Sequence, residues 1–320
     1  MMNDKKDYNV MKFYFYFFEK NYKIISLNIL FETVLPIVEI NLYRILTEEV
    51  LEDIQNDKVV DMQKIQLIMQ DVLQFFKYFI LIIISKFINK LVVNLIIPQF
   101  RILSRRLIFE NYLSDSENTK KNTSLIITLG AMPMALYNVY KSILKFVLPL
   151  IALHIYISYS IYALDKGKIF VITILYCMMN LFSLALMIIY QSKLSSKVWS
   201  QHGKLVEKYN QFYELQDTLS IESLNEKILK EEQMFEQKRF IFYKRLNFLV
   251  YWHMVMFLFF SFYISFLFYK TDNPFHTKKV ITLFLFCGKY FSTLIRLSKL
   301  TIESFGRIRI LNDSLSKAKQ

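Results

Sequence analysis

Ionisable side chains inside long apolar segments are the feature of this sequence most suited to chemistry. Charged groups are costly in a bilayer core, so they usually face a partner helix or a water-filled cavity. Five residues are candidates for a substrate or proton pathway: Glu32, Glu39, Arg44, His253 and Arg296. Glu32 and Glu39 share one face of a helix because two helical turns separate them. An equally open alternative for Glu39, Arg44 and Arg296, and for Lys86 and Lys90, is snorkelling or structural pairing.

The sequence contains no motif for phosphate transfer, metal binding or nucleophilic catalysis. A phosphate-binding loop requires G-x-x-x-x-G-K-[ST], and the glycines, at 130, 167, 203, 288 and 306, are not spaced in that way. The histidines lie in different segments without metal-ligand spacing. Cys177 and Cys287 fall inside apolar segments, which indicates packing residues. We therefore expect no enzymatic activity, no metal site and no cofactor bound by this chain.

The composition predicts a polytopic membrane protein built from helices. Of the 320 residues, 54% are hydrophobic. The apolar residues gather in blocks near 22–46, 72–100, 143–163, 169–190, 247–269 and 280–298. Each block is close to the roughly 20 residues that cross a hydrocarbon core about 30 Å thick. The chain has only 5 Gly and 5 Pro, and a lipid-facing backbone must form helices or a closed barrel. We expect an all-α fold with six long transmembrane helices.

The net charge of +13 follows membrane topology rather than nucleic-acid binding. Lys and Arg gather before the first block, between the second and third, and between the fourth and fifth, which share one side of a six-span topology. The segment between the first two blocks is acidic. By the positive-inside rule, both termini and the segments 101–142 and 191–246 are expected in the cytosol. The expected environment is the lipid bilayer, and no nucleic-acid partner is expected.

The two cytosolic segments are expected to form long helical hairpins. In the segment that follows the fourth block, apolar residues recur at helical spacing: Leu194, Val198, Leu205, Tyr209 and Phe212. In the segment that precedes the fifth block, the same spacing recurs: Ile221, Leu224, Ile228, Phe235 and Phe242. A helix over about 168–213 would be on the order of 70 Å long, more than twice the hydrocarbon core. It must therefore project, with its tip near 214–221. The polar stretch 114–124 forms the other tip, although its composition also suits a plain solvated loop.

Several local features resemble the exporter-type transmembrane domain of ABC transporters. Met11 to Tyr22 is similar to that family's elbow helix, and Pro36 falls where its first span often has a proline. Asp217-Thr-Leu-Ser-Ile221, followed by Glu231-Glu-Gln-Met-Phe235, resembles the coupling segment "E-S-L-S-G-I" and its downstream acidic pair. The segment from Glu303 to Asn312 resembles "A-S-A-x-R-I-x-E-L-L-D". The chain departs from the family in having Asp217 for Glu, no coupling-segment glycine and no "D-x-x-x-I" after the first tip.

The resemblance implies the ABC exporter transmembrane fold and a division of the chain into parts. These are an N-terminal elbow segment over 1–21, a six-helix domain over 22–312 and a polar tail over 313–320, where an ATP-binding domain would begin. It also implies a homo- or heterodimer and a separate ATP-binding subunit that supplies ATP hydrolysis. The residues that couple to this subunit would be Asp217, Leu219 and Ile221 at one tip and Asn118 and Lys120 at the other.

Three functions stay open at the level of sequence. The first is a stand-alone transmembrane subunit of an ABC-type transporter, which moves a substrate by alternating access with the ATPase supplied in trans. The second is a carrier of the same fold without an ATPase, driven by an ion gradient, with Glu32 and Glu39 as proton carriers. The third is a membrane scaffold that does not transport.

Overall fold

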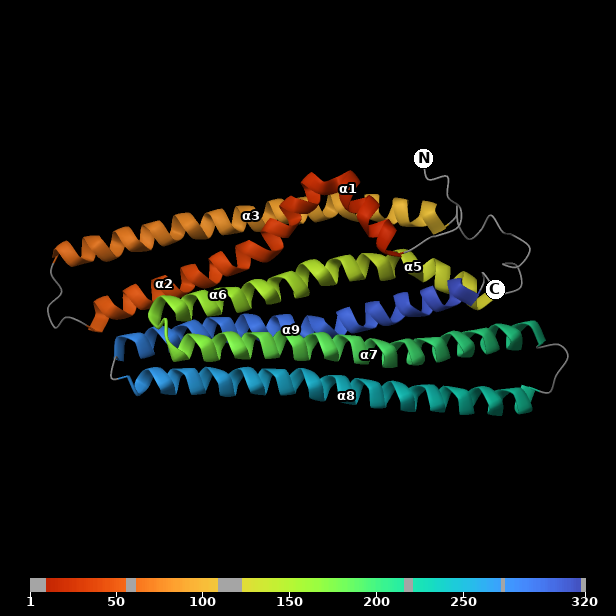
Figure 1. The fold of residues 1–320 in the computed structure, drawn as a ribbon. Coiled ribbons are helices and arrows are strands. Elements are labelled where there is room, and N and C mark those ends of the chain that lie inside the picture. Colours follow the sequence, from red (N-terminus) through yellow and green to blue (C-terminus); the bar gives the residue numbers. More distant parts are fainter. Residues whose placement is uncertain (1–9, 56–61, 109–122, 216–220, 272–273, 318–320) are drawn as a thin grey trace.

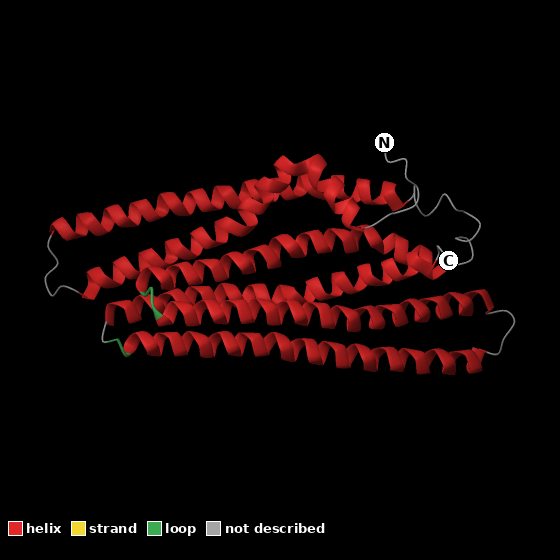
Figure 2. Ribbon diagram, in the orientation of Figure 1, coloured by secondary structure: helices red, strands yellow, loops and turns green. Residues whose placement is uncertain are grey.

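Regular structure in the described part of the chain is entirely helical. The computed structural model describes residues 10–55, 62–108, 123–215, 221–271 and 274–317, and these ranges contain helices and short turns without a strand (Figure 2). Six stretches are long and apolar enough to cross a membrane: Phe13–Glu48, Phe75–Arg106, Pro133–Leu164, Lys168–Val206, Ile228–Tyr269 and His276–Ile310. This confirms the expected all-α, multi-pass membrane architecture.

The first and third spans are each interrupted by a short π-helical turn. The first span runs through α1 (Val10–Ile29), η1 (Leu30–Val34) and α2 (Leu35–Gln55). The third runs through α5 (Thr123–Ser142), η3 (Ile143–Val147) and α6 (Leu148–Leu164). The other spans are α3 (Met62–Ile108), α7 (Lys168–Leu215), α8 (Ile221–Tyr269) and α9 (Pro274–Lys317). The sequence pattern did not predict the two interruptions.

Helix α9 is the centre of the bundle. It packs against α2, α5, α6, α7 and α8, and in Figure 1 it runs between α6 and the paired helices α7 and α8. One buried core joins α6, α7, α8 and α9. A second core joins α1, α3 and α5. The bundle therefore has two packed halves, and α9 contributes to both, with Ile302 in the first core and Ile308 in the second.

Helices α7 and α9 approach each other closely at Gly306. A Cβ atom built on this glycine would lie 2.6 Å from the Cβ of Ser195 and 3.1 Å from the backbone nitrogen of Ser196. Real Cβ atoms do not approach other atoms as closely as the first of these distances. The absence of a side chain at Gly306 is therefore what allows these two helices to meet.

Helices α7 and α8 form a long antiparallel pair. They contain 48 and 49 residues without a break, which corresponds to a length on the order of 70 Å each. Val198, Leu205, Phe235 and Phe242 are buried in their shared core. This confirms the predicted helical continuation of both spans and the apolar face of these residues. The side chains of Phe212, Ile221 and Leu224 lie outside the described part of the structure.

The ends of the helices fall into two groups at opposite ends of the bundle. In Figure 1, α1 begins and α9 ends at the end where α7 stops and α8 starts, whereas α6 turns into α7 at the other end. That turn is held by Asp165, whose carboxylate oxygens accept hydrogen bonds from the backbone N–H groups of Gly167 (3.0 Å) and Ile169 (3.1 Å). The start of α1 and the end of α9 lie at the same end of the bundle, as an even number of spans requires.

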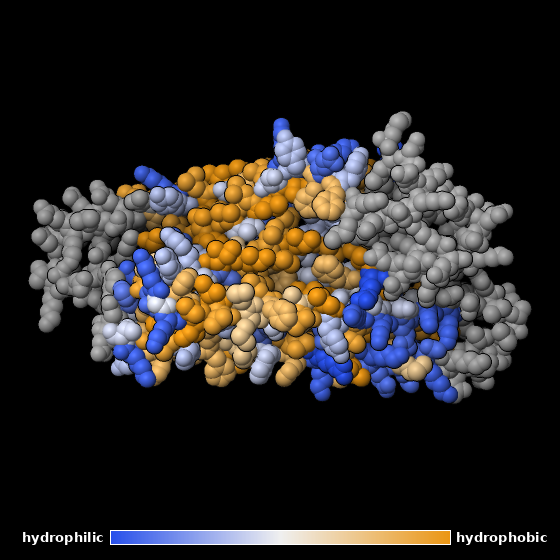
Figure 3. Space-filling model, viewed as in Figure 1, coloured by the Kyte–Doolittle hydropathy of each residue, from blue (hydrophilic) through white to orange (hydrophobic). Residues whose placement is uncertain are grey.

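An apolar belt crosses the middle of the bundle. Figure 3 shows hydrophobic side chains across the centre of the visible face, with hydrophilic ones toward both ends and most densely over the far parts of α7 and α8. Large apolar side chains such as Phe182, Phe259 and Leu285 are about two-thirds exposed. Surfaces of this kind are unfavourable in water and suit contact with lipid.

The start of α1 packs one face of its aromatic segment against α3. Its backbone leaves helical geometry at Asn21 (φ −119°, ψ 21°), which separates the aromatic segment from the first span. Phe13 and Phe17 are buried against Phe100 of α3, with ring centroids 5.1 and 4.7 Å apart. Phe15 is 73% exposed. Only one face of this segment is thus available to lipid headgroups, because the other face belongs to the second core.

Candidate functional site

Glu32 and Lys145 form an ion pair between the two π-helical turns. The Nζ of Lys145 lies 3.3 Å from Oε1 of Glu32, and the carboxylate side chain is the more buried of the two. Glu32 precedes Pro36 by four positions, and Lys145 precedes Pro149 by four positions. Proline has no N–H, so neither carbonyl receives its usual i→i−4 hydrogen bond. Each charged residue therefore lies at a weakened point of its helix.

The π-helical turns are the local response to these prolines. The N–H of Leu35 donates to the carbonyl of Leu30, and the N–H of Leu148 donates to the carbonyl of Ile143, five residues back in each case. Single π-helical turns inside α-helices are frequent at functional sites. η1 and η3 contact each other, so the two irregular segments meet at one depth in the bundle.

A chain of amide and hydroxyl groups extends this ion pair to α3 and α5. Nδ2 of Asn89 donates to Oε1 of Glu32 (2.9 Å). Nδ2 of Asn28 donates to Oδ1 of Asn89 (2.8 Å), and the hydroxyl of Tyr140 donates to Oδ1 of Asn28 (3.2 Å). Asn28 is 1% exposed. The first three spans thus contribute to one polar network, in which a lysine and an amide both contact the Glu32 carboxylate.

Glu39 makes a separate ion pair with α3. The Nζ of Lys86 lies 2.7 Å from Oε2 of Glu39, and the lysine side chain is 54% exposed. Glu32 and Glu39 both contact residues of α3, as their position on one helical face predicts. Their lysine partners differ, because Glu32 pairs with Lys145 and Glu39 with Lys86. For Glu39, pairing is the interpretation that the geometry supports. Lys90, one turn after Lys86, is exposed.

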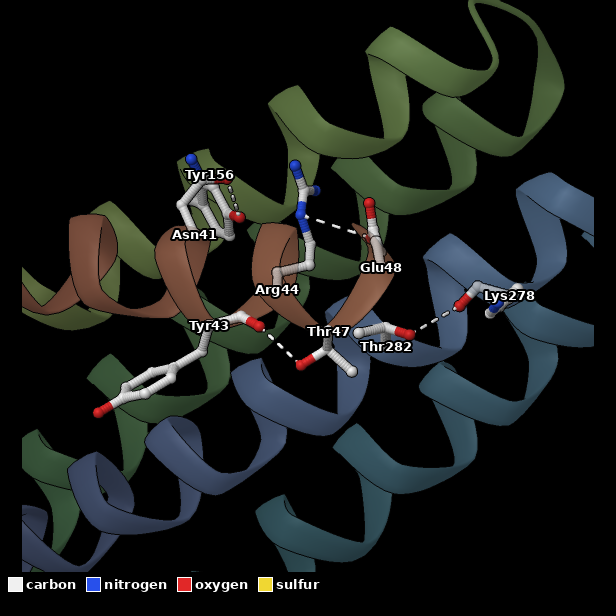
Figure 4. A network of polar contacts seen from close by, with 8 residues as sticks. All are labelled: Asn41, Tyr43, Arg44, Thr47, Glu48, Tyr156, Lys278 and Thr282. Carbon is white, nitrogen blue, oxygen red and sulfur yellow. Dashed lines mark hydrogen bonds and ion pairs between the residues drawn. The ribbon is translucent and has the colours of Figure 1, made fainter. Parts of the chain in front are cut away.

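Arg44 lies in a polar cluster between α2 and α6. Asn41, Arg44 and Glu48 project from one side of α2, while Tyr43 and Thr47 project from the other (Figure 4). The hydroxyl of Tyr156 donates to Oδ1 of Asn41 (3.0 Å). The Nε of Arg44 is 3.7 Å from Oε1 of Glu48, and its Cζ is 5.9 Å from the centre of the Tyr156 ring. On the other side of α2, the Tyr43 ring stacks on Phe286 of α9 and holds the helix in place.

A cavity of about 370 Å³ opens beside this cluster, between α2, α6 and α9; we name it the α2–α6 cavity. Its polar lining comes from Asn41, Arg44, Glu48, Tyr156, Ser160 and Lys279. The remaining lining is apolar apart from the Tyr159 hydroxyl: Ile37, Val38, Tyr159, Ala163 and Leu164. Cavities of this size and mixed chemistry are typical of small-molecule sites.

His253 and Arg296 lie apart from the residues of the first span. His253 is buried between α8 and α7, with Nδ1 2.8 Å from the carbonyl of Leu249 and Nε2 3.2 Å from Oγ of Ser183. Because a carbonyl only accepts, Nδ1 carries a proton. Arg296 is exposed on α9. Among the described residues, no hydrogen bond or ion pair joins either of them to Glu32, Glu39 or Arg44, so we assign them no common site.

The partners of the charged residues were not predicted. Lys145 is an ionisable residue inside the apolar block near 143–163, and Glu32 became a candidate for the same reason. Lys145 could therefore have been identified from the sequence. Asn89, Asn28, Tyr140 and Tyr156 carry no charge at neutral pH and are common in helices, so no pattern distinguishes them. Cys177 and Cys287 are free and buried, as expected. No group of three or more His, Cys, Asp or Glu among the described residues is placed to hold a metal ion.

The predicted coupling residues lie, in sequence, between α3 and α5 and between α7 and the first residue of α8. Asp217, Leu219, Asn118 and Lys120 lie outside the described residues. Ile221 is the first residue of α8, and its side chain also lies outside the described part. The helix ends that flank them are described: α3 ends at Ile108 and α5 begins at Thr123, and α7 ends at Leu215.

Comparison with known proteins found no family model and no curated protein that matches this sequence.

Proposed function

We propose that this chain is the stand-alone transmembrane subunit of an ABC-type transporter, which moves a substrate across a membrane by alternating access while a separate subunit hydrolyses ATP. The observation that carries the proposal is the length of the α7–α8 pair. Each helix has more than twice the roughly 20 residues that a bilayer requires. The excess lies at the end of the bundle where α1 begins and α9 ends (Figure 1). A lever of this kind suits a partner that acts outside the membrane.

The α7–α8 pair is built to transmit force as a unit. Phe235 and Phe242 fill its core, and on its surface Nζ of Lys208 lies 2.6 Å from Oε1 of Glu231. The proposed ATP-binding subunit pushes on Asp217, Leu219 and Ile221 at the tip of this pair, and on Asn118 and Lys120 at the tip between α3 and α5. The long helices then move as rigid bodies. The π-helical turns η1 and η3 give the first and third spans a place to bend.

The proposal includes a dimer of twelve spans, as a homo- or heterodimer. Alternating access in this arrangement requires two six-helix subunits to enclose a pathway between them. The polar groups of the first span, Glu32, Glu39 and Arg44, are the proposed contribution of this chain to that pathway.

Purification from the native membrane tests the proposal. An ATP-binding protein should co-purify with the chain, and the double substitution Leu219→Asp and Ile221→Asp should abolish co-purification while insertion into the membrane stays intact. Lys168→Asp, at the exposed start of α7 on the opposite end of the bundle, is the matched control and should retain the partner. A native complex without any ATP-binding protein contradicts the proposal.

The Glu32 network favours one alternative, an ion-gradient-driven carrier of the same fold. A carboxylate inside a span that is in contact with both a lysine and an amide is a group that can carry a proton. In proteoliposomes with an imposed proton gradient, Glu32→Gln or Glu39→Gln should then stop substrate-dependent proton flux, and the Leu219 and Ile221 substitutions should have no effect. A chain that neither binds an ATPase nor carries flux would be a non-transporting scaffold.

A further inference from the structure

We propose that the α2–α6 cavity binds an amphipathic anion, with the carboxylate or phosphate group held at Arg44 and the apolar chain lying along Ile37 and Val38. As a substrate site, this inference rests on the proposed transport function. As a binding site, it rests only on the lining of the cavity and can be tested without any partner.

The guanidinium of Arg44 has unused donor capacity. Its Nε is buried and makes no hydrogen bond to a described residue. The 3.7 Å separation from Oε1 of Glu48 is an ion pair but exceeds hydrogen-bonding distance. A planar guanidinium donates two parallel hydrogen bonds to a carboxylate or phosphate, and these are among the strongest polar contacts in proteins. A bound anion would accept the hydrogen bonds that the Arg44 guanidinium does not donate to Glu48.

The charge of the lining also favours an anion. Arg44 and Lys279 supply two positive charges and Glu48 one negative charge, which leaves the cavity with a net charge of +1. The Tyr156 hydroxyl donates to Oδ1 of Asn41, which leaves the amide nitrogen of Asn41 as a further donor in the lining. Donors therefore outnumber acceptors on the polar wall.

The position of the cavity favours a ligand with an apolar chain. Arg44 and Glu48 lie toward the end of the first span (Phe13–Glu48), and Ser160 lies toward the end of α6, whereas Ile37 and Val38 lie deeper along the first span. At the rim, Val38 and Tyr159 are 47% and 70% exposed. The cavity thus opens sideways on the apolar belt, with its charged groups nearer to the end of the bundle. An amphipathic molecule aligned with the lipids matches this order of polar and apolar groups.

Binding of a fluorescent fatty acid tests the inference. The probe is dansyl-labelled undecanoate, added to the full chain in phosphatidylcholine nanodiscs, and the readout is its increase in fluorescence. Decanoate and decyl phosphate should displace the probe, whereas decanol should be weaker by about tenfold or more, because it lacks the charge that Arg44 pairs with. Displacement by decyltrimethylammonium as effective as that by decanoate would overturn the inference.

Variants locate the bound probe. Arg44→Gln should weaken probe binding by about tenfold. Arg309→Gln is the matched control, because Arg309 is exposed on α9 and does not line the cavity, and it should bind as the unchanged chain does. Ala163→Phe fills the cavity without changing a charge and should abolish binding, so it decides the question should Arg44→Gln fail to fold. Unchanged affinity in a folded Arg44→Gln or Ala163→Phe variant would refute the site.

The lipid composition distinguishes two sources of the anion. If phosphatidylglycerol in the nanodisc weakens probe binding to the unchanged chain, an anionic lipid headgroup occupies the site. If it has no effect, the occupant is a free amphipathic anion. Both results retain the proposed chemistry. No ATP-binding subunit takes part in the probe-binding test. A negative result there therefore does not contradict the proposed transport function, and a negative co-purification result does not contradict the proposed anion site.

Discussion

Oε1 of Glu32 lies 3.3 Å from Nζ of Lys145 at the place where the first and third spans both leave regular α-helical geometry. Each residue stands four positions before a proline and inside a π-helical turn. The ion pair therefore joins the two weakest points of the two helices. A bend in one span is mechanically linked to a bend in the other as long as this pair is intact.

Removal of one partner of this pair should destabilise the protein more than removal of both. Lys145→Met leaves the Glu32 carboxylate without its cation inside the span, at a cost of about 1–2 kcal/mol, since both side chains keep some exposure. Thermal unfolding in detergent should show a lower Tm for Lys145→Met and for Glu32→Gln, and partial recovery in the double variant. Lys141→Met, one turn earlier on α5, is the control and should change Tm little. Strictly additive losses in the double variant would show that the pair is not coupled.

The π-helical turn at η1 should disappear when Pro36 is replaced. Pro36→Ala supplies an N–H that donates to the carbonyl of Glu32 and restores the α-helical hydrogen-bond ladder. Hydrogen exchange followed by mass spectrometry should then show slower exchange in peptides that cover 30–36. Pro98→Ala, at the proline inside the continuous helix α3, is the control and should leave these peptides unchanged. Equal exchange of the 30–36 peptides in Pro36→Ala and the unchanged chain would count against the proline as the cause.

Two glycines in long helices should respond to alanine in opposite directions. Gly306→Ala forces α7 and α9 apart, because the new Cβ meets the side chain of Ser195 and the backbone nitrogen of Ser196, and overpacking of this kind costs about 1–3 kcal/mol. Gly203→Ala meets no atom within 4 Å. It should stabilise α7 by up to about 1 kcal/mol, the usual gain of alanine over glycine in a helix. Thermal unfolding of the two variants checks the difference in sign, and a Gly306→Ala variant as stable as Gly203→Ala would disprove the close contact.

Both termini and both hairpin tips are predicted to lie in the cytosol. Single cysteines at Ser116 and Ser220, in a background with Cys177 and Cys287 replaced by alanine, should be protected from a membrane-impermeant thiol reagent in intact cells. A cysteine at Asn56, in the acidic segment on the opposite side, should react. Strong labelling at Ser116 or Ser220 from outside would reverse the assigned orientation.

The sequence alone determined the features that depend on local pattern. Six apolar blocks predicted six spans because span length is set by bilayer thickness. The helical spacing of Val198, Leu205, Phe235 and Phe242 predicted that α7 and α8 continue beyond their spans, and these side chains are buried in the core of the pair. The common direction of Glu32 and Glu39 toward α3 likewise followed from their separation along one helix.

Only the tertiary structure decided which groups meet across helices. Nothing in the chain indicates that Lys145 faces Glu32 or that Tyr156 bonds to Asn41, 115 residues away, because the depth and rotation of each helix depend on packing against all its neighbours. Pro36 and Pro149 are visible in the sequence, but a proline is compatible with a kink as well as a π-helical turn, and the contact of η1 with η3 is a property of the packed bundle. For the same reason the α2–α6 cavity, whose lining comes from three spans, has no signature in the sequence.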